Sequence, residues 1–281
     1  MKIKITSDST CDLSQELLDR YQIMMMPLYV NMDGKPMRDQ IDVQPKDVFS
    51  YYERTGELCF TSACNIGEYL EQFSALRNEY DAVIHISLSS EFSSSHQNAV
   101  LAAQELENVY VVDSRNLSYG QGILTILASN LAVRGMPPQE IVNELQLAVN
   151  RVDTSFILNQ LEFLHKGGRC SGVAMLGANL LKLKPCIEVV DGKMSVGKKY
   201  RGGFDKCVEQ YIRDRLANTD ALDLSQIFLI TAGVSETTVE NAAKIIHECV
   251  GEDTVIYRDF AGCTISCHCG PGTLGLALVR K

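Results

Sequence analysis

Short apolar strands and helical segments follow one another from residue 2 to about residue 152, and few folds accommodate that order. Strand patterns cover residues 2–6, 24–30, 82–87 and 109–112, and helical patterns cover 13–21, 45–54, 66–76, 95–106, 119–133 and 139–152. Buried strands that alternate with helices form a parallel sheet with helices on both faces. The first half of the chain is therefore predicted to be an α/β domain.

The pattern changes near residue 155. Residues 184–190 and 193–199 flank Asp191-Gly192, a pair that favours a tight hairpin turn. Helices are expected over 162–166, 204–216 and 237–250, and strands over 227–231 and 254–259. The 281 residues suit two modest cores better than one. We predict an N-terminal parallel-sheet α/β domain over residues 1–155 and a smaller mixed-sheet α/β domain over residues 156–281.

The charge of the chain limits its partners. The net charge is −9, which argues against binding nucleic acid, because phosphates need a basic footprint. The segment 165–206 differs, with nine Lys and Arg residues against three acidic ones. It is either a solvated face or a docking surface for an acidic or phosphate-carrying partner.

Targeting and membrane signals are not visible in the sequence. The first residues alternate like a strand, and the most apolar stretch, near 123–133, is too short to span a bilayer. We therefore expect a cytoplasmic protein with no integral membrane segment. Its ten Cys residues are then expected to be reduced thiols.

Hydroxyl-rich turns follow three predicted strands of the first domain. They read Thr6-Ser7-Asp8-Ser9, Ser87-Leu88-Ser89-Ser90 and Val112-Asp113-Ser114. Ligands of open parallel sheets bind beyond the carboxyl ends of the strands. Each turn alone is explained by ordinary turn chemistry, but their recurrence favours a ligand site.

Two further hydroxyl groups precede predicted helices. Thr61-Ser62 comes shortly before a helix that begins near Asn65, where Asn65 and Glu68 resemble a capping box, and Ser93-Ser94-Ser95 opens the next one. Helix N-termini offer free N–H groups and a partial positive charge. Hydroxyls added there suit a carboxylate better than a phosphate, because no cation is built into these turns.

In order and spacing, these segments resemble the DegV family. The resemblance runs from residue 3 nearly to the end of the chain and rests on Thr6–Leu13, Thr61-Ser62, Ser87–Ser95, Val112-Asp113-Ser114, Gly120-Gln121-Gly122, Leu161–Arg169 and Leu181–Pro185. It implies a protein that binds one long-chain fatty acid and is not itself an enzyme. It also implies a carrier that presents the carboxylate to a bacterial fatty acid kinase, which makes an acyl phosphate. The segment 165–206 is a candidate docking surface for that kinase.

The resemblance implies roles for individual residues. Thr61 or Ser62, with Ser93 or Ser94, would hold the carboxylate, and Ser95 is less favoured. Arg169 and His268 would lie near the head group; a histidine ordinarily titrates near neutrality and can donate to the same oxygens. Two departures from the family pattern are Ala63-Cys64 in place of Gln-Pro, and Phe92-Ser93-Ser94-Ser95 in place of Leu-Ser-Gly-Thr.

A fatty acid also needs an apolar tunnel, which we expect between the two domains. Each buried methylene contributes about 0.8 kcal/mol, so a chain of about fifteen offers on the order of 12 kcal/mol before the costs of association. Candidate lining or backbone-approach residues are Gly120, Gly122, Ile123, Met175 and Leu176. The alternative is that these residues only pack the core. No cofactor is expected beyond the lipid.

Other readings stay open. Cys263, Cys267, His268 and Cys269 form a dense group of possible metal ligands, although zinc sites usually pair Cys residues two to four apart. A metal-dependent or serine hydrolase is the rival enzyme class, but the sequence contains no Gly-x-Ser-x-Gly motif. Lipid storage or transport without kinase coupling is the rival binding function.

Overall fold

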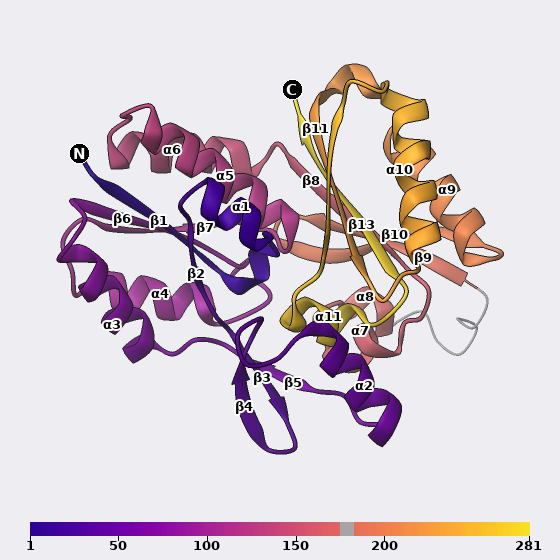
Figure 1. The fold of residues 1–281 in the computed structure, drawn as a ribbon, viewed down its shortest axis with the longest axis horizontal. Coiled ribbons are helices and arrows are strands. Elements are labelled where there is room, and N and C mark those ends of the chain that lie inside the picture. The colour runs from indigo at the N-terminus through magenta and orange to yellow at the C-terminus, as the bar shows by residue number, and fades with distance from the viewer. Residues whose placement is uncertain (175–182) are drawn as a thin grey trace. The chain divides into compact units, whose positions relative to one another are not determined.

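The computed structural model describes residues 1–174 and 183–281 (Figure 1). It contains two compact units. Unit 1 comprises residues 1–43, 61–150 and 191–193, and unit 2 comprises residues 44–60, 151–190 and 194–281. Each unit has its own sheet and core, so each is described by itself.

A four-stranded parallel sheet forms the centre of unit 1. Its strand order is β2-β1-β6-β7, and each neighbouring pair is parallel. The strands are β1 (Ile3–Asp8), β2 (Met24–Met26), β6 (Ala82–Ser87) and β7 (Val109–Asp113). All six side chains of β6 are buried, as expected for a central strand covered on both faces. The predicted parallel sheet is confirmed.

Helices cover both faces of this sheet. In Figure 1, α3 and α4 lie on one face, and α1, α5 and α6 lie on the other. The helices are η1 (Ser9–Cys11), α1 (Gln15–Arg20), α3 (Ile66–Arg77), α4 (Ser95–Ala103), α5 (Tyr119–Val133) and α6 (Pro138–Val149). The predicted capping box at the start of α3 is present: Asn65 Oδ1 accepts from Glu68 N at 3.0 Å, and Asn65 N donates to Glu68 Oε2 at 2.9 Å.

A small second sheet of order β4-β3-β5 lies after β2 in the sequence. Its strands are β3 (Tyr29–Met32), β4 (Lys35–Arg38) and β5 (Phe60–Ser62). The prediction of one strand over residues 24–30 is wrong, because the chain leaves the first sheet at Pro27. Proline has no N–H to donate to a ladder, and Leu28 N instead donates to Ser9 Oγ at 3.1 Å.

Unit 2 is built on a six-stranded mixed sheet of order β10-β9-β8-β13-β11-β12. The strands are β8 (Val152–Leu158), β9 (Leu183–Val190), β10 (Lys193–Arg201), β11 (Leu222–Ala232), β12 (Val255–Phe260) and β13 (Thr273–Arg280). The predicted hairpin is confirmed between β9 and β10. Its turn has Asp191 at φ 50° and Gly192 at φ 78°, which is the left-handed backbone that a tight two-residue turn requires.

Two apolar clusters cover the sheet of unit 2. One contains buried residues of α9 and α10, and the other contains buried residues of α7, α8 and α11. The helices are α2 (Pro45–Thr55), α7 (Glu162–Gly167), α8 (Ser171–Ala174), α9 (Phe204–Arg215), η3 (Thr219–Ala221), α10 (Glu236–Val250) and α11 (Cys263–Cys269). Phe49 of α2 packs against the second cluster, which explains why residues 44–60 belong to unit 2.

The division between the units differs from the predicted boundary near residue 155. That position lies inside β8, which pairs with β13 and β9, so the sheet keeps the strand whole. The units divide at Asn150 and Arg151 instead, with residues 44–60 in unit 2 and 191–193 in unit 1. The added segment makes unit 2 similar in size to unit 1 rather than smaller.

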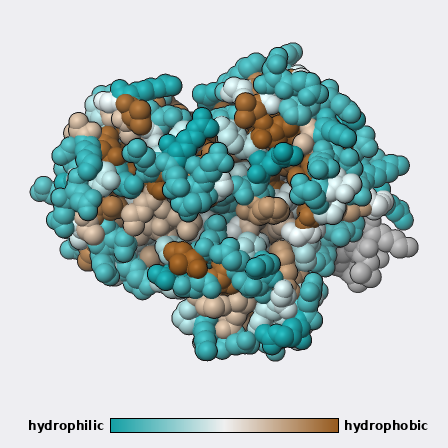
Figure 2. Space-filling view, viewed as in Figure 1, coloured by the Kyte–Doolittle hydropathy of each residue, from teal (hydrophilic) through white to brown (hydrophobic). Residues whose placement is uncertain are grey.

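The surface in view is mostly hydrophilic, with small separate apolar patches (Figure 2). The exposed large apolar side chains include Phe60, Val133, Leu147 and Phe260. Across residues 1–174 and 183–281, none of the helices combines the length and the apolar character needed to cross a membrane.

Candidate functional site

Polar residues meet at the carboxyl edge of the unit 1 sheet, as the sequence predicted. The register pairs Ser7 of β1 with Ile86 of β6, and Ser87 of β6 with Asp113 of β7. Asp8, Ser87 and Asp113 therefore end three adjacent strands at one edge. This is the edge at which parallel sheets bind ligands.

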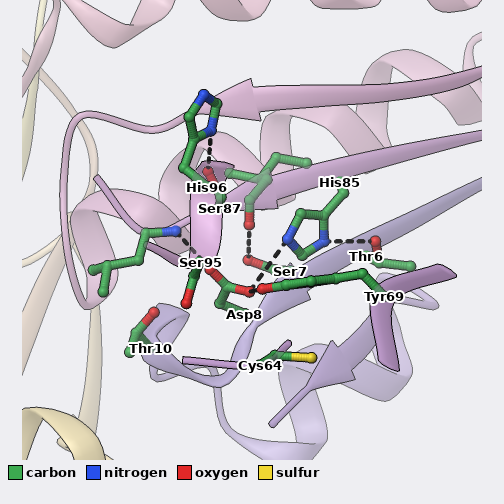
Figure 3. A network of polar contacts seen from close by, with 12 residues as sticks. Thr6, Ser7, Asp8, Thr10, Cys64, Tyr69, His85, Ser87, Ser95 and His96 are labelled. Atoms are coloured by element: carbon green, nitrogen blue, oxygen red, sulfur yellow. Dashed lines mark hydrogen bonds and ion pairs between the residues drawn. The ribbon is translucent and has the colours of Figure 1, made fainter. Parts of the chain in front are cut away.

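Asp8 is the centre of a buried polar network at this edge (Figure 3). Its side chain is fully buried and accepts two hydrogen bonds, from Tyr69 Oη at 2.5 Å and from Leu88 N at 2.8 Å. His85 Nε2 lies 3.2 Å from the same Asp8 oxygen that Tyr69 contacts. A buried carboxylate is tolerated only with such partners, because its loss of hydration is costly.

The other side chains of the network hold their neighbours in fixed orientations. Thr6 Oγ1 lies 2.9 Å from His85 Nδ1, and the rings of Tyr69 and Phe73 pack beside the imidazole at 5.2 and 5.6 Å between centroids. Burial and the adjacent Asp8 carboxylate raise the pKa of Tyr69 well above its ordinary value. Tyr69 therefore stays a neutral hydrogen-bond donor over the physiological range.

The network reaches the predicted head-group residues through Ser95. The Ser95 side chain is fully buried at the start of α4, near enough to Tyr69 to influence its pKa. Ser95 Oγ lies 3.1 Å from Ser93 Oγ, and Ser95 N donates to Ser93 Oγ at 3.2 Å. Ser95 thus has an internal role, whereas Ser93 is partly exposed and Ser94 is exposed.

The segment that follows Thr61 and Ser62 is tied to α4. Both lie in β5, and Ser62 Oγ accepts from Asn31 Nδ2 at 3.3 Å. Asn98 of α4 donates from Nδ2 to the carbonyl oxygen of Cys64 at 2.8 Å, which ties the segment after β5 to α4. The sequence did not single out Asn98; its signal is a side-chain amide one turn into a helix that begins with three serines.

Cys64, one of the departures from the family pattern, lies beside this connection. Its side chain is buried, and burial raises the pKa of its thiol. The thiol therefore stays protonated at neutral pH and is a poor nucleophile.

The Gly120-Gln121-Gly122 segment has a packing role within unit 1. Gln121 Nε2 donates to Ser7 Oγ at 2.9 Å, and Thr10 Oγ1 donates to Gln121 Oε1 at 2.9 Å, which fastens α5 to β1 and η1. A Cβ at Gly122 would lie 2.9 Å from the carbonyl oxygen of Cys11. The lack of a side chain at Gly122 therefore lets α5 lie close to the backbone of η1. Gly120 and Ile123 are buried beside it, and their place in a tunnel stays a prediction.

Arg169 and His268 lie together in unit 2. α7 is followed by Gly168, whose φ of 69° reverses the chain, and Arg169 Nη1 donates to the carbonyl oxygen of Gly167 at 2.8 Å. The His268 ring packs on the same glycine, since a Cβ at Gly167 would lie 2.5 Å from His268 Nδ1. The Gly167-Gly168-Arg169 motif thus holds a guanidinium beside an imidazole.

The expectation that His268 titrates near neutrality is corrected by its surroundings. Burial, with a smaller effect from the Arg169 guanidinium, lowers the pKa of His268 to about 4. The imidazole is therefore neutral at pH 7 and acts there as a neutral donor or acceptor. Arg169 is the cation of this pair.

Several predicted site residues stay untested. Thr61, Ser62, Ser93 and Ser94 belong to unit 1, whereas Arg169 and His268 belong to unit 2, so their joint grip on one carboxylate stays a prediction. Met175 and Leu176 lie outside the described residues.

The cysteine-rich segment forms helix α11. Cys263, Cys267 and Cys269 are buried, and Cys269 packs in an apolar cluster with Phe156 and Leu164. In the part of the chain that the structure describes, no three His, Cys, Asp or Glu side chains are grouped so that they could hold a metal ion.

Some cations of the basic segment 165–206 are paired. Lys166 Nζ lies 2.7 Å from Glu162 Oε1, and Lys198 Nζ lies 2.6 Å from Asp214 Oδ2. Lys199, Arg201 and Lys206 are exposed. The segment therefore presents less uncompensated charge than its sequence indicates, with these three as the better candidates for a partner.

Comparisons with known proteins agree with one another. A family model described as "Uncharacterised protein, DegV family" matches residues 2–281. A DegV domain-containing protein from Caldanaerobacter subterraneus subsp. tengcongensis is 32% identical over 284 residues, covering 100% of this chain and 99% of its own.

Solved structures are similar over the full length. A DegV family protein from Thermus thermophilus, described by its fatty acid binding, has a TM-score of 0.90 at 28% identity, with 100% of both chains covered. DegV from Bacillus subtilis, described as a fatty acid binding protein, has a TM-score of 0.86 at 27% identity, also with 100% of both chains covered.

Proposed function

Because the chain belongs to the DegV family, we propose that it binds one long-chain fatty acid and is a binding protein rather than an enzyme. The carboxylate is held by the hydroxyls of Thr61, Ser62, Ser93 and Ser94 at the carboxyl edge of the unit 1 sheet. The neutral imidazole of His268 and the guanidinium of Arg169 complete the head-group site.

The observation that carries this proposal is the fixed set of hydroxyls at the start of α4. The Asn98 bond to the Cys64 carbonyl joins the β5 segment to α4, and the backbone N–H of buried Ser95 donates to Ser93 Oγ. Neutral donors held in place in this way suit a single carboxylate, which accepts several hydrogen bonds.

Most of the affinity is expected to come from the hydrocarbon tail. Each buried methylene contributes about 0.8 kcal/mol, so even a modest head-group contribution permits tight binding. The head group then mainly fixes the direction in which the lipid enters. An apolar tunnel that includes Ile123, Met175 and Leu176 is part of the proposal.

The test is organic extraction of the purified protein followed by mass spectrometry. We expect a fatty acid in close to equimolar amount, and stoichiometric rebinding of oleate after delipidation. Lipid-free protein that also ignores added oleate would overturn the proposal.

We further propose that the bound fatty acid is presented to a kinase, which transfers a phosphoryl group to the carboxylate and forms an acyl phosphate. The exposed cations Lys199, Arg201 and Lys206 are the proposed contacts, since Lys198 is paired with Asp214. Storage or transport of the lipid without phosphorylation is the alternative.

The kinase proposal is tested with a fatty acid kinase catalytic subunit, ATP and the loaded protein, trapping any acyl phosphate as a hydroxamate. Lys199→Glu with Lys206→Glu is expected to raise the carrier concentration needed for half-maximal rate while leaving oleate binding unchanged. Lys244→Glu, at an exposed position of α10, is the control. No hydroxamate with fully loaded carrier would favour storage or transport.

A further inference from the structure

A cavity opens at the edge of the unit 1 sheet opposite the candidate head-group site. Its volume is about 400 Å³, within the range of small-molecule pockets. It is lined by the first half of β1, the end of α1, Tyr80 and the last turn of α5. β1 begins at this edge, next to the N label in Figure 1, and ends at Asp8 in the network described above.

The lining of this cavity is divided by chemistry. Lys4, Arg20, Gln22 and Asn130 supply cationic and amide donors. Apolar side chains in the lining include Ile3, Ala132 and Val133. A ligand that matches both parts has an anionic group joined to a small apolar body.

The cations are held in place by aromatic rings and a carbonyl. Lys4 Nζ donates to the carbonyl oxygen of Gln22 at 2.8 Å and lies 5.7 Å from the centre of the Tyr80 ring. Lys2 Nζ lies 4.2 Å from the same ring centre, and the Arg20 guanidinium lies 5.5 Å from that of Tyr21. Cation–π contacts of this kind fix long side chains without neutralising them.

The positive charge in the cavity is only weakly compensated. Among residues 1–174 and 183–281, neither Lys4 nor Arg20 forms an ion pair with a carboxylate. Glu79 acts on Lys4 from a distance, and burial lowers the pKa of the Lys4 ammonium. A partly desolvated cation gains when an anion arrives.

We propose that this cavity binds a small organic phosphate, with the phosphate between Lys4 and Arg20 and the apolar body against Ile3 and Val133. A phosphate monoester carries between one and two negative charges at neutral pH, roughly matching the two cations. The planar guanidinium can donate two parallel hydrogen bonds to its oxygens, and Lys4 adds a point charge. The proposal does not depend on fatty-acid binding.

The experiment is a titration of the delipidated protein with phenyl phosphate, followed by ¹H–¹⁵N NMR of the lining residues. We expect saturable shifts at Lys4, Gln22 and Asn130 that weaken as salt is added. Inorganic phosphate is expected to bind more weakly, because it lacks the apolar body. Phenylacetate, a carboxylate of similar shape, is expected to bind at least severalfold more weakly.

Matched variants locate the binding. Lys4→Met and, separately, Arg20→Gln should each weaken phenyl phosphate about tenfold, whereas Lys35→Met, an exposed lysine of the same unit, should leave it unchanged. Ser93→Ala should also leave these shifts unchanged, which separates this cavity from the fatty-acid site. The proposal would be overturned if phenylacetate or benzyl alcohol bound as tightly as phenyl phosphate. It would also be overturned if Lys35→Met weakened phenyl phosphate as much as Lys4→Met, or if the lining residues showed no shifts.

Discussion

The interiors of the two units contain different kinds of buried side chain. At the carboxyl edge of the unit 1 sheet, Thr6, Ser7, Asp8 and His85 are fully buried. The cluster under α9 and α10 in unit 2 is mainly aliphatic. Its central polar group, Tyr211 Oη, donates to the carbonyl oxygen of Ser155 at 2.8 Å and accepts from Leu276 N at 3.1 Å.

This difference indicates which unit specifies a ligand. An aliphatic core is sufficient for stability, so a fully buried carboxylate with three partners has to be explained by something else. The Asp8–Tyr69 pair lies near buried Ser95, whose backbone N–H donates to the partly exposed Ser93. Unit 1 therefore uses its polar interior to orient surface groups, whereas the interior of unit 2 mainly stabilises its fold.

The largest expected effect comes from breaking the network of unit 1 at its centre. Asp8→Ala removes the acceptor of Tyr69 Oη and Leu88 N and leaves both buried, so unit 1 should lose about 3–5 kcal/mol of stability. Native-state hydrogen exchange should show faster opening of β1 and β6 amides, with β11 and β13 unaffected. Equal acceleration in both units would contradict the contrast between them.

The second effect lies in unit 2 and depends on pH. The histidine pKa is about 6.5 in an unfolded chain, and that of His268 is about 4 when folded. The unfolded state therefore takes up the proton first as the pH falls. The neutral ring contributes its full stability above about pH 6.5, and this contribution is lost as the pH falls to about 4. The loss in the free energy of unfolding is at most about 3 kcal/mol.

Urea unfolding between pH 4 and pH 7 checks this expectation. His268→Gln should flatten the stability profile of unit 2 in that window, while His165→Gln, an exposed histidine on α7, should keep it. A profile that is unchanged in His268→Gln would show that the acid sensitivity arises elsewhere.

The third effect compares two buried tyrosines. Tyr69→Phe removes a donor to Asp8, and Tyr211→Phe removes the bonds to Ser155 and Leu276. Each should cost about 1–3 kcal/mol of stability, since each leaves a buried partner unsatisfied. Fatty-acid affinity, measured by displacement of a fluorescent fatty acid, should fall in Tyr69→Phe and stay unchanged in Tyr211→Phe. Weakening in both variants would mean that loss of stability, rather than positioning, lowers the affinity.

The features that the sequence predicted correctly have local signals. The capping box of α3 needs only Asn65 and Glu68, and the β9–β10 turn needs only Asp191 and Gly192. Strand ends rich in hydroxyls are equally visible along the chain, and the parallel register then brings them to one edge. Such patterns are decided by a few neighbouring residues.

The features that the sequence missed depend on distant partners. β13 lies between β8 and β11 in the sheet, although β8 is far from it in sequence. Tyr69 and Asn98 act on Asp8 and Cys64, which are 61 and 34 residues away. The low pKa of His268 likewise follows from packing on Gly167 and from Arg169. No short window of sequence contains these pairs.

The smallest expected effect tests whether the two units grip the same carboxylate. Ser93→Ala should weaken fatty-acid binding by about 1 kcal/mol, a factor of about five, because one neutral hydrogen bond is lost. Ser90→Ala, an exposed serine of the same loop, is the control. Arg169→Gln should weaken binding on its own. If both side chains contact one head group, the double variant should depart from additivity by at least about 0.5 kcal/mol. Strict additivity would show that the two side chains do not act on one head group.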